Sequence, residues 1–142
     1  KADSMPYLEH LNRGFGPLSA KVWCDDEAHL RTHAHPAFDK WAEWYKTGHK
    51  VFPENLELSP LTAKHWYAGD GGLVSGHNQI QFYTRNERER LGWLAELFEN
   101  KGFETRTENC KNTSARVILK DGKGALDWMG DPLPAFHHKW NL

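Results

Sequence analysis

The chain has 142 residues, with 18 Lys and Arg, 19 Asp and Glu, and a formal net charge of −1 when its nine histidines are neutral. This length suffices for one domain with a hydrophobic core, and the 39% hydrophobic and 26% charged residues exclude a disordered or fibrous chain. A charge balance near zero neither indicates nor excludes a polyanionic partner, since the distribution of charge matters more than its sum.

We expect no signal peptide, and the sequence contains no apolar run approaching about 18 residues, the length needed to cross a membrane. Its two cysteines, Cys24 and Cys110, are consistent with a reducing compartment. We therefore expect an intracellular protein, in the cytoplasm or in an organelle of a eukaryotic cell, that does not bind membranes.

The first fifty residues predict the order helix, strand, strand, helix. The evidence is helical spacing of apolar residues, two short apolar runs around a polar turn, and a second amphipathic stretch ended by a glycine. The predicted elements are the helix Met5–Phe15, the strands Ala20–Cys24 and His29–His33, and a helix from His35-Pro36 to Gly48. The stripe of Trp41, Trp44 and Tyr45 on the second helix is expected to face the core rather than stack on bases.

A connector over Val51–Leu58 contains a proline that forbids helix there. Ser59 and Pro60 then form a strong helix start, because serine caps free N–H groups and proline at the first helical position loses only an N–H that has no partner. We expect this helix to run to about Gly69, where Asp70-Gly71-Gly72 must stop it.

The rest of the chain predicts strand, strand, helix, strand, strand, helix. Asn86 is expected to cap the first of these helices with Glu89 completing a capping box, and residues 87–90 to form a solvated first turn. The predicted elements are the strands Leu73–Ser75 and Gln79–Thr84, the helix from Asn86 to Gly102, the strands Phe103–Glu108 and Ala115–Leu119 joined by a turn over 109–112, and the helix Gly124–Met129.

Residues 59–142 therefore predict one αββαββα unit, and the shorter N-terminal block matches the second part of that unit. We divide the chain into residues 1–50, the C-terminal part of a truncated first unit, 51–58, a connector, and 59–142, a complete second unit. The two blocks share no obvious residue identity, so this repeat is inferred from the order of elements alone.

The run LTAKHWYAGDGGL, Leu61–Leu73, resembles the signature helix of the LAGLIDADG homing endonucleases, with the nine-residue motif on Ala63–Gly71. The segment Trp44–Pro60 resembles the one that joins the two halves of monomeric members, and the element order follows the family to the last residues, His138–Trp140. The resemblance implies an α+β LAGLIDADG fold, in which αββαββα units form an antiparallel, saddle-shaped sheet.

The sequence departs from the family pattern at several places. The first motif helix, which carries a second acid, is absent, Lys64 and His65 replace apolar or small residues, and Ala68 stands at a position that is often acidic or apolar. Because Lys1–Ser4 begins where a second strand would have ended, we expect a fragment or one piece of a split protein. The second LAGLIDADG half would come from a missing N-terminal segment, a partner chain or a homodimer.

The resemblance implies a site-specific endonuclease, associated with an intron or an intein, that hydrolyses double-stranded DNA with a divalent cation. In the family each motif helix delivers one acid that holds the cation, usually Mg²⁺ but alternatively Mn²⁺ or Ca²⁺, against a scissile phosphate. The implied metal ligands are Asp70 and the backbone carbonyl of Gly69. From spacing alone, an Asp in a tight turn after a helix remains the alternative.

The outward face of the sheet is the implied DNA surface, because Gln and Arg side chains can read adenine and guanine edges in the major groove. The implied DNA-binding residues are His77, Gln79, Gln81, Tyr83, Arg85, Arg106 and Arg116. Lys120 resembles the family's active-site lysine, and Arg85 resembles a position that organises active-site water, so both are expected to be catalytic with Asp70. A solvated sheet face and surface ion pairs are the alternatives.

Two other function classes remain open at this stage. A non-catalytic DNA- or RNA-binding protein, such as a maturase or a transcription regulator, would keep the fold and lose the metal requirement. A metabolic α+β domain with a chance motif would bind DNA no better than other neutral proteins.

Overall fold

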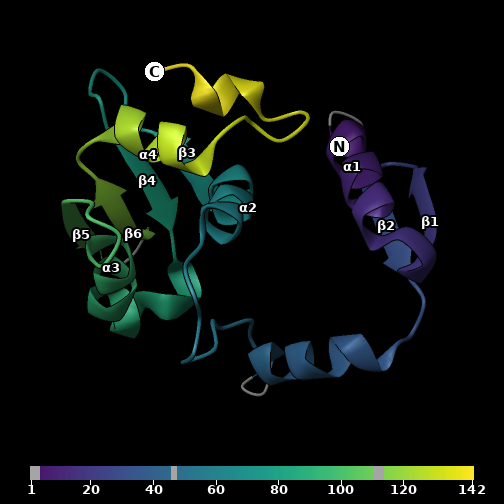
Figure 1. Ribbon diagram of the computed structural model, residues 1–142. Helices are drawn as coiled ribbons and strands as arrows, with labels where there is room; N and C mark the ends of the chain where they lie inside the picture. Colours follow the sequence, from purple (N-terminus) through teal and green to yellow (C-terminus); the bar gives the residue numbers. More distant parts are fainter. Residues whose placement is uncertain (1–3, 46–47, 111–113) are drawn as a thin grey trace.

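The computed structural model describes residues 4–45, 48–110 and 114–142. At the N-terminus, helix α1 packs on a two-stranded antiparallel sheet of β1 and β2 (Figure 1). The register pairs Val22 with Leu30 and Trp23 with His29. The elements of this segment are α1 (Met5–Phe15), the 3₁₀ turn η2 (Gly16–Leu18), β1 (Ser19–Cys24), β2 (Ala28–Thr32) and the 3₁₀ helix η3 (Pro36–Tyr45).

The predicted α-helix after His35-Pro36 forms as the 3₁₀ helix η3, and the prediction that its aromatic stripe is core is wrong for two of its three members. Trp41 is 41% exposed and Tyr45 is 58% exposed. A 3₁₀ helix has three residues per turn, so residues four apart no longer share one face. Trp44 does contact another aromatic ring, that of Phe52, at a centroid distance of 6.2 Å.

The second sheet has four antiparallel strands in the order β3-β4-β6-β5. Helices α2, α3 and α4 cover one face of it, where Tyr67, Phe82, Phe98, Val117 and Leu119 form the centre of the core (Figure 1). The elements are α2 (Pro60–Asp70), β3 (Gly71–Leu73), β4 (Ile80–Tyr83), the 3₁₀ helix η4 (Arg85–Arg90), α3 (Leu91–Glu99), β5 (Thr105–Cys110), β6 (Ser114–Leu119), α4 (Gly122–Met129) and the 3₁₀ helix η5 (His137–Trp140).

The start of α2 is as predicted, and its end at Asp70 lies one residue beyond the predicted Gly69. The Ser59 hydroxyl accepts a hydrogen bond from the Thr62 N–H at 3.1 Å. The helix continues through Asp70, and the two glycines expected in a turn begin strand β3 instead. A Cβ on Gly71 would lie 2.1 Å from the Tyr67 ring. Only glycine therefore allows β3 to begin so close to α2. Asp70 is therefore joined directly to the sheet.

The predicted capping box is wrong. The 3₁₀ helix η4 precedes α3, which begins at Leu91 with no side-chain cap. The Asn86 side chain instead donates to the Lys50 carbonyl at 3.3 Å, because the connector passes beside η4. The last helix begins two residues earlier than predicted, where Asp121 accepts from the Gly124 N–H at 3.0 Å. The predicted turn over 109–112 lies partly outside the described residues.

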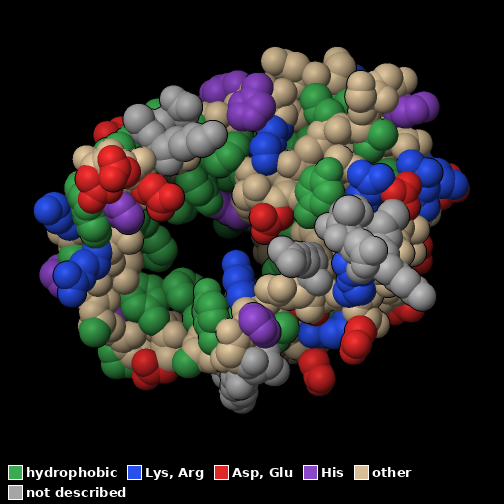
Figure 2. Space-filling view, turned by 180° about the vertical axis from the view of Figure 1, so that it is seen from behind, with side chains coloured by type: hydrophobic (Ala, Val, Ile, Leu, Met, Phe, Trp, Pro, Cys, Tyr) green, Lys and Arg blue, Asp and Glu red, His purple; other side chains and the backbone are tan. Residues whose placement is uncertain are grey.

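The N-terminal segment meets the rest of the chain at few places. The Tyr7 hydroxyl lies 3.0 Å from His65 Nδ1 on α2, and the Tyr7 ring contacts Phe136 edge-on at 5.1 Å. Figure 2 shows an opening through the molecule between this segment and the four-stranded unit, with hydrophobic side chains on its rim. In the described ranges, no helix has both the length and the apolar character needed to cross a bilayer.

Candidate functional site

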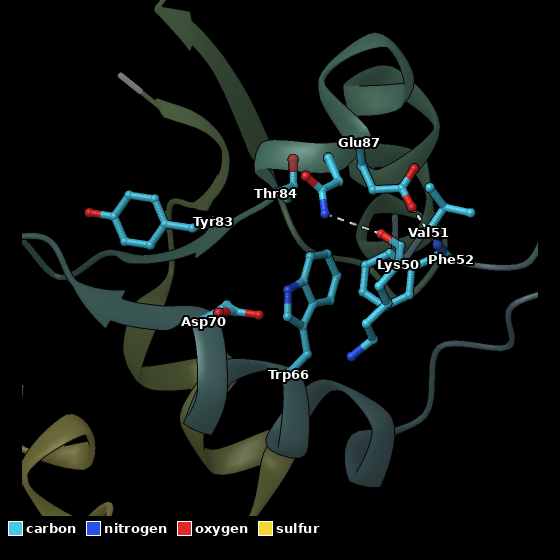
Figure 3. Close-up of a pocket in the computed structure, with 9 residues that line it drawn as sticks. Lys50, Val51, Phe52, Trp66, Asp70, Tyr83, Thr84 and Glu87 are labelled. Atoms are coloured by element: carbon cyan, nitrogen blue, oxygen red, sulfur yellow. Dashed lines mark hydrogen bonds between the residues drawn. The ribbon is translucent and has the colours of Figure 1, made fainter. Parts of the chain in front are cut away.

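Asp70 is the last residue of α2, and its exposed side chain lies at a cavity of about 260 Å³. Trp66, one helical turn earlier, forms the inner wall of the same cavity (Figure 3). Tyr83 and Thr84 approach from the end of β4, so the sheet places a predicted DNA-binding residue beside the predicted metal ligand. The remaining lining residues are Lys50, Val51, Phe52, Asn86 and Glu87.

Glu87 fixes the wall of the cavity, although residues 87–90 were expected to form a solvated turn. Its carboxylate is only 4% exposed and accepts a hydrogen bond from the Phe52 N–H. Arg90 lies 3.2 Å from the same carboxylate and donates to the Phe52 carbonyl at 2.9 Å. These contacts anchor the connector to η4, so the prediction of full solvation is wrong at Glu87.

A lysine from the C-terminal 3₁₀ helix η5 lies at the end of α2. Lys139 Nζ donates to the carbonyls of Ala68 and Gly71, each at 2.8 Å, and lies 3.4 Å from the Tyr67 carbonyl. Burial lowers the pKa of Lys139, and the nearby charge of Asp70 partly opposes this shift. No local pattern in the sequence indicates this contact, because Lys139 follows Gly71 by 68 positions.

The donors present fit part of a site for a hard divalent cation. Within the described residues, no group of three or more His, Cys, Asp or Glu side chains gathers in one place. Mg²⁺ does not require such a group, because it keeps several waters and is typically bound by one or two carboxylates together with phosphate oxygens. The exposed Asp70 carboxylate, next to the exposed Gly69 on the same helical turn, offers oxygen ligands of the right kind.

The outward face of the sheet carries a hydrogen-bonded network of the predicted DNA-binding residues. Arg116 Nη1 donates to Gln81 Oε1 at 2.6 Å, and Gln81 Nε2 donates to the Tyr83 hydroxyl at 2.9 Å. Gln81 is therefore only 7% exposed, because Arg116 and Tyr83 cover it. The hydrogen bonds that Arg116 donates to the Glu108 carboxylate are the main reason that the pKa of Arg116 is raised.

The other predicted residues of this face are more loosely placed. Arg106 Nη2 lies 3.5 Å from the Oε1 of Gln79, the residue before β4. His77 is exposed in the preceding turn, where its N–H donates to the Val74 carbonyl at 3.1 Å. Arg85 begins η4 directly after Thr84, and its side chain lies outside the described part of the structure.

Lys120 is not brought beside Asp70. The register pairs Gly71 with Phe82 and Tyr83 with Arg116, so Asp70 is level with Arg116 on β6. Lys120 follows β6 four residues beyond Arg116, roughly 13 Å along the strand direction. Its ammonium group pairs with Glu104, which is the surface ion pair that the sequence left open as an alternative.

A family model described as the LAGLIDADG DNA endonuclease family matches residues 11–124, which include α2 and the whole four-stranded sheet. The chain belongs to this family. The predicted resemblance is thereby confirmed, and the alternative of a metabolic domain with a chance motif is wrong. Membership supports DNA endonuclease function in general.

A solved structure shows the same fold. It is described as the homing endonuclease I-WcaI bound to its DNA recognition sequence, and it matches with a TM-score of 0.76 at 16% sequence identity. The match covers 96% of this chain and 71% of that chain. No curated protein matches the sequence. The predicted α+β LAGLIDADG fold is confirmed.

Proposed function

We propose that this chain contributes one catalytic half of an endonuclease that cuts double-stranded DNA at a specific site with a divalent cation. The observation that carries the proposal is the position of Asp70. It ends the motif helix, its carboxylate is exposed, and the next residue begins the sheet whose polar face would meet DNA. One helix end thus supplies a metal ligand at the edge of a nucleic-acid surface.

Asp70 and the Gly69 carbonyl would hold the cation, which we propose is Mg²⁺, with Mn²⁺ or Ca²⁺ as alternatives. A cation held there would stabilise negative charge on a phosphate and lower the pKa of a bound water. Lys120 and Arg85 remain predicted catalytic residues. The distance of Lys120 from Asp70 along the sheet favours a contact with a DNA phosphate over a contact with the cation.

The polar face of the sheet supports a DNA partner. Arg106, Arg116, Gln79 and Gln81 supply the donors and acceptors that base edges require, and the arginines can also bind phosphates. The related fold of I-WcaI is described bound to its DNA recognition sequence. We propose that His77 and Tyr83 extend the same surface beside the candidate cleavage site.

A second LAGLIDADG half would complete the enzyme. The order α1, β1, β2, η3 supports the division into a partial first unit over 1–50, a connector over 51–58 and a full unit over 59–142. The opening in Figure 2 and the 63% exposed Leu61 on α2 support a further motif helix packing beside α2. That half would come from a preceding segment, a partner chain or a second copy.

The test is selection from a randomised duplex library by the wild-type chain and the Asp70→Asn variant, with and without Mg²⁺. Enrichment of one sequence by both proteins, with Mg²⁺-dependent cutting only by the wild type, is the expected result. Enrichment without cutting would instead indicate a non-catalytic DNA-binding protein such as a maturase or regulator. No enrichment by either protein would contradict DNA binding by the chain.

A further inference from the structure

The ammonium group of Lys139 spans the two residues that carry the candidate metal ligands. Its hydrogen bonds at 2.8 Å reach Ala68, the residue before Gly69, and Gly71, the residue after Asp70. A single side chain therefore joins both ends of the Gly69–Asp70 backbone. The group that makes this bridge comes from η5, which is distant in sequence but packs against β3.

The end of α2 needs such a partner. The last four carbonyls of a helix have no intrahelical donor and carry partial negative charge. The Gly71 N–H satisfies the Tyr67 carbonyl, and the three N–H donors of Lys139 supply further bonds. Hydrogen bonds from a charged donor are stronger than neutral ones, and partial burial reduces their screening by solvent.

Lys139 is itself held in place from several sides. The Tyr67 hydroxyl donates to the Lys139 carbonyl at 2.9 Å, and burial raises the pKa of Tyr67, so this hydroxyl remains a donor. Trp140 contacts the Tyr67 ring edge-on at 5.1 Å and donates from Nε1 to the Gly130 carbonyl at 2.9 Å. The backbone that carries Lys139 is thus held in place, and its ammonium group contacts the end of α2.

We propose that Lys139 is a positioning residue for the candidate metal site. By holding Ala68 and Gly71, it fixes the backbone between them and presents the Asp70 carboxylate and the Gly69 carbonyl in one geometry. Without it, the last turn of α2 would fray, and cation binding would have to order that turn. This role rests on the proposed function, because it requires that Gly69 and Asp70 bind the cation.

Groups that orient metal ligands typically contribute 10–100-fold to metal affinity. Lys139→Met should therefore weaken cation binding about tenfold, since methionine keeps much of the aliphatic stem and loses all three donors. Lys139→Arg should recover most of the affinity, because its guanidinium can reach the same carbonyls. Lys101→Met, at an exposed lysine after α3, is the matched control.

The measurement is Tb³⁺ luminescence, excited through the tryptophans and titrated for the wild type, the three lysine variants and Asp70→Asn. Hydrogen exchange of the amides of residues 69–72 is measured on the same proteins and does not depend on cleavage. The expected result is weaker Tb³⁺ binding and faster exchange in Lys139→Met, with recovery in Lys139→Arg. The bond from Tyr67 uses the Lys139 backbone and persists in every variant, which favours folding.

Wild-type Tb³⁺ affinity in folded Lys139→Met would overturn the proposal, as would unchanged exchange at residues 69–72. Tighter binding would also overturn it, because the ammonium would then act as a competing cation. If the wild type and Asp70→Asn bind Tb³⁺ equally, the metal role of Asp70 is wrong, and the proposed function fails independently of Lys139.

Discussion

Glu108 on β5 and Arg116 on β6 are paired in register, and Arg116 donates from both Nε and Nη2 to the same carboxylate oxygen. The other oxygen of Glu108 lies 3.4 Å from Arg106 Nη2. One carboxylate therefore partly neutralises two arginines on the face proposed to meet DNA. A DNA phosphate or base has to replace Glu108 before either guanidinium is fully available.

Glu108→Gln should strengthen non-specific DNA binding several-fold at low salt and make it more salt-dependent, because it adds net positive charge where phosphates bind. It should also reduce the ratio of specific to non-specific affinity, since the arginines lose the partner that fixes them. Fluorescence anisotropy with random duplexes at several salt concentrations measures both effects. Glu89→Gln, at an exposed position on η4, removes the same charge elsewhere. Equal affinities for the two variants would contradict the prediction.

Gly71→Ala should destabilise the fold by roughly 2–3 kcal/mol, because its Cβ would meet both the ring and the carbonyl of Tyr67 at the start of β3. Gly69→Ala is the matched control, since a Cβ there has no neighbour within 4 Å. Alanine in the helix should raise stability by about 0.5 kcal/mol. Urea unfolding followed by tryptophan fluorescence compares the two. Similar midpoints would show that β3 moves easily away from α2.

Glu87→Ala should destabilise the chain by about 2 kcal/mol, because it removes the acceptor of the Phe52 N–H and leaves Arg90 without its carboxylate. The connector should loosen from η4, and with it the wall of the cavity at Asp70. Glu89→Ala, two residues away and exposed, should change the free energy of unfolding little. Equal losses for both variants in urea unfolding would mean that the buried carboxylate is not the anchor.

The sequence predicted the elements whose signals are local. Ser59 and Pro60 define the start of α2, and the alternation around Ile80 and Phe82 defines β4. The end of α2 also lies within one residue of its prediction, but the two glycines predicted as a turn begin β3. Glycine is required at position 71 because a Cβ there would meet Tyr67, and only the packed structure shows this contact.

The candidate site was predictable only in part. The motif predicts Asp70. The other two contributions come from long-range contacts: Glu87 binds Phe52, 35 residues away, and Lys139 binds Ala68, 71 residues away. Glu87 was interpreted as solvated because its neighbours in sequence are charged, and a pattern of charges does not show which carboxylate folds inward. Long-range contacts of this kind leave no periodicity to detect.

The contact between α1 and α2 should depend on pH. Burial, and then the nearby positive groups His10 and Lys64, lower the pKa of His65, whose Nδ1 lies 3.0 Å from the Tyr7 hydroxyl. A histidine with a lowered pKa in the folded state binds fewer protons there than in the unfolded chain. Its contribution to stability is therefore present above the unfolded pKa, about 6.5, and is lost as the pH falls through the folded value.

The urea midpoint of the wild type should therefore fall between pH 7 and pH 5, and His65→Gln should show a shallower fall, because glutamine has no proton to gain. Other groups titrate in this range, so the measured quantity is the difference in slope between the two proteins. His77→Gln, at an exposed histidine in the turn before β4, should keep the wild-type slope. A His65→Gln slope equal to that of the wild type would show that protonation of His65 does not weaken the contact with Tyr7. The Tyr7 hydroxyl is present in both proteins, so a difference in slope between them comes from the titrating side chain at position 65.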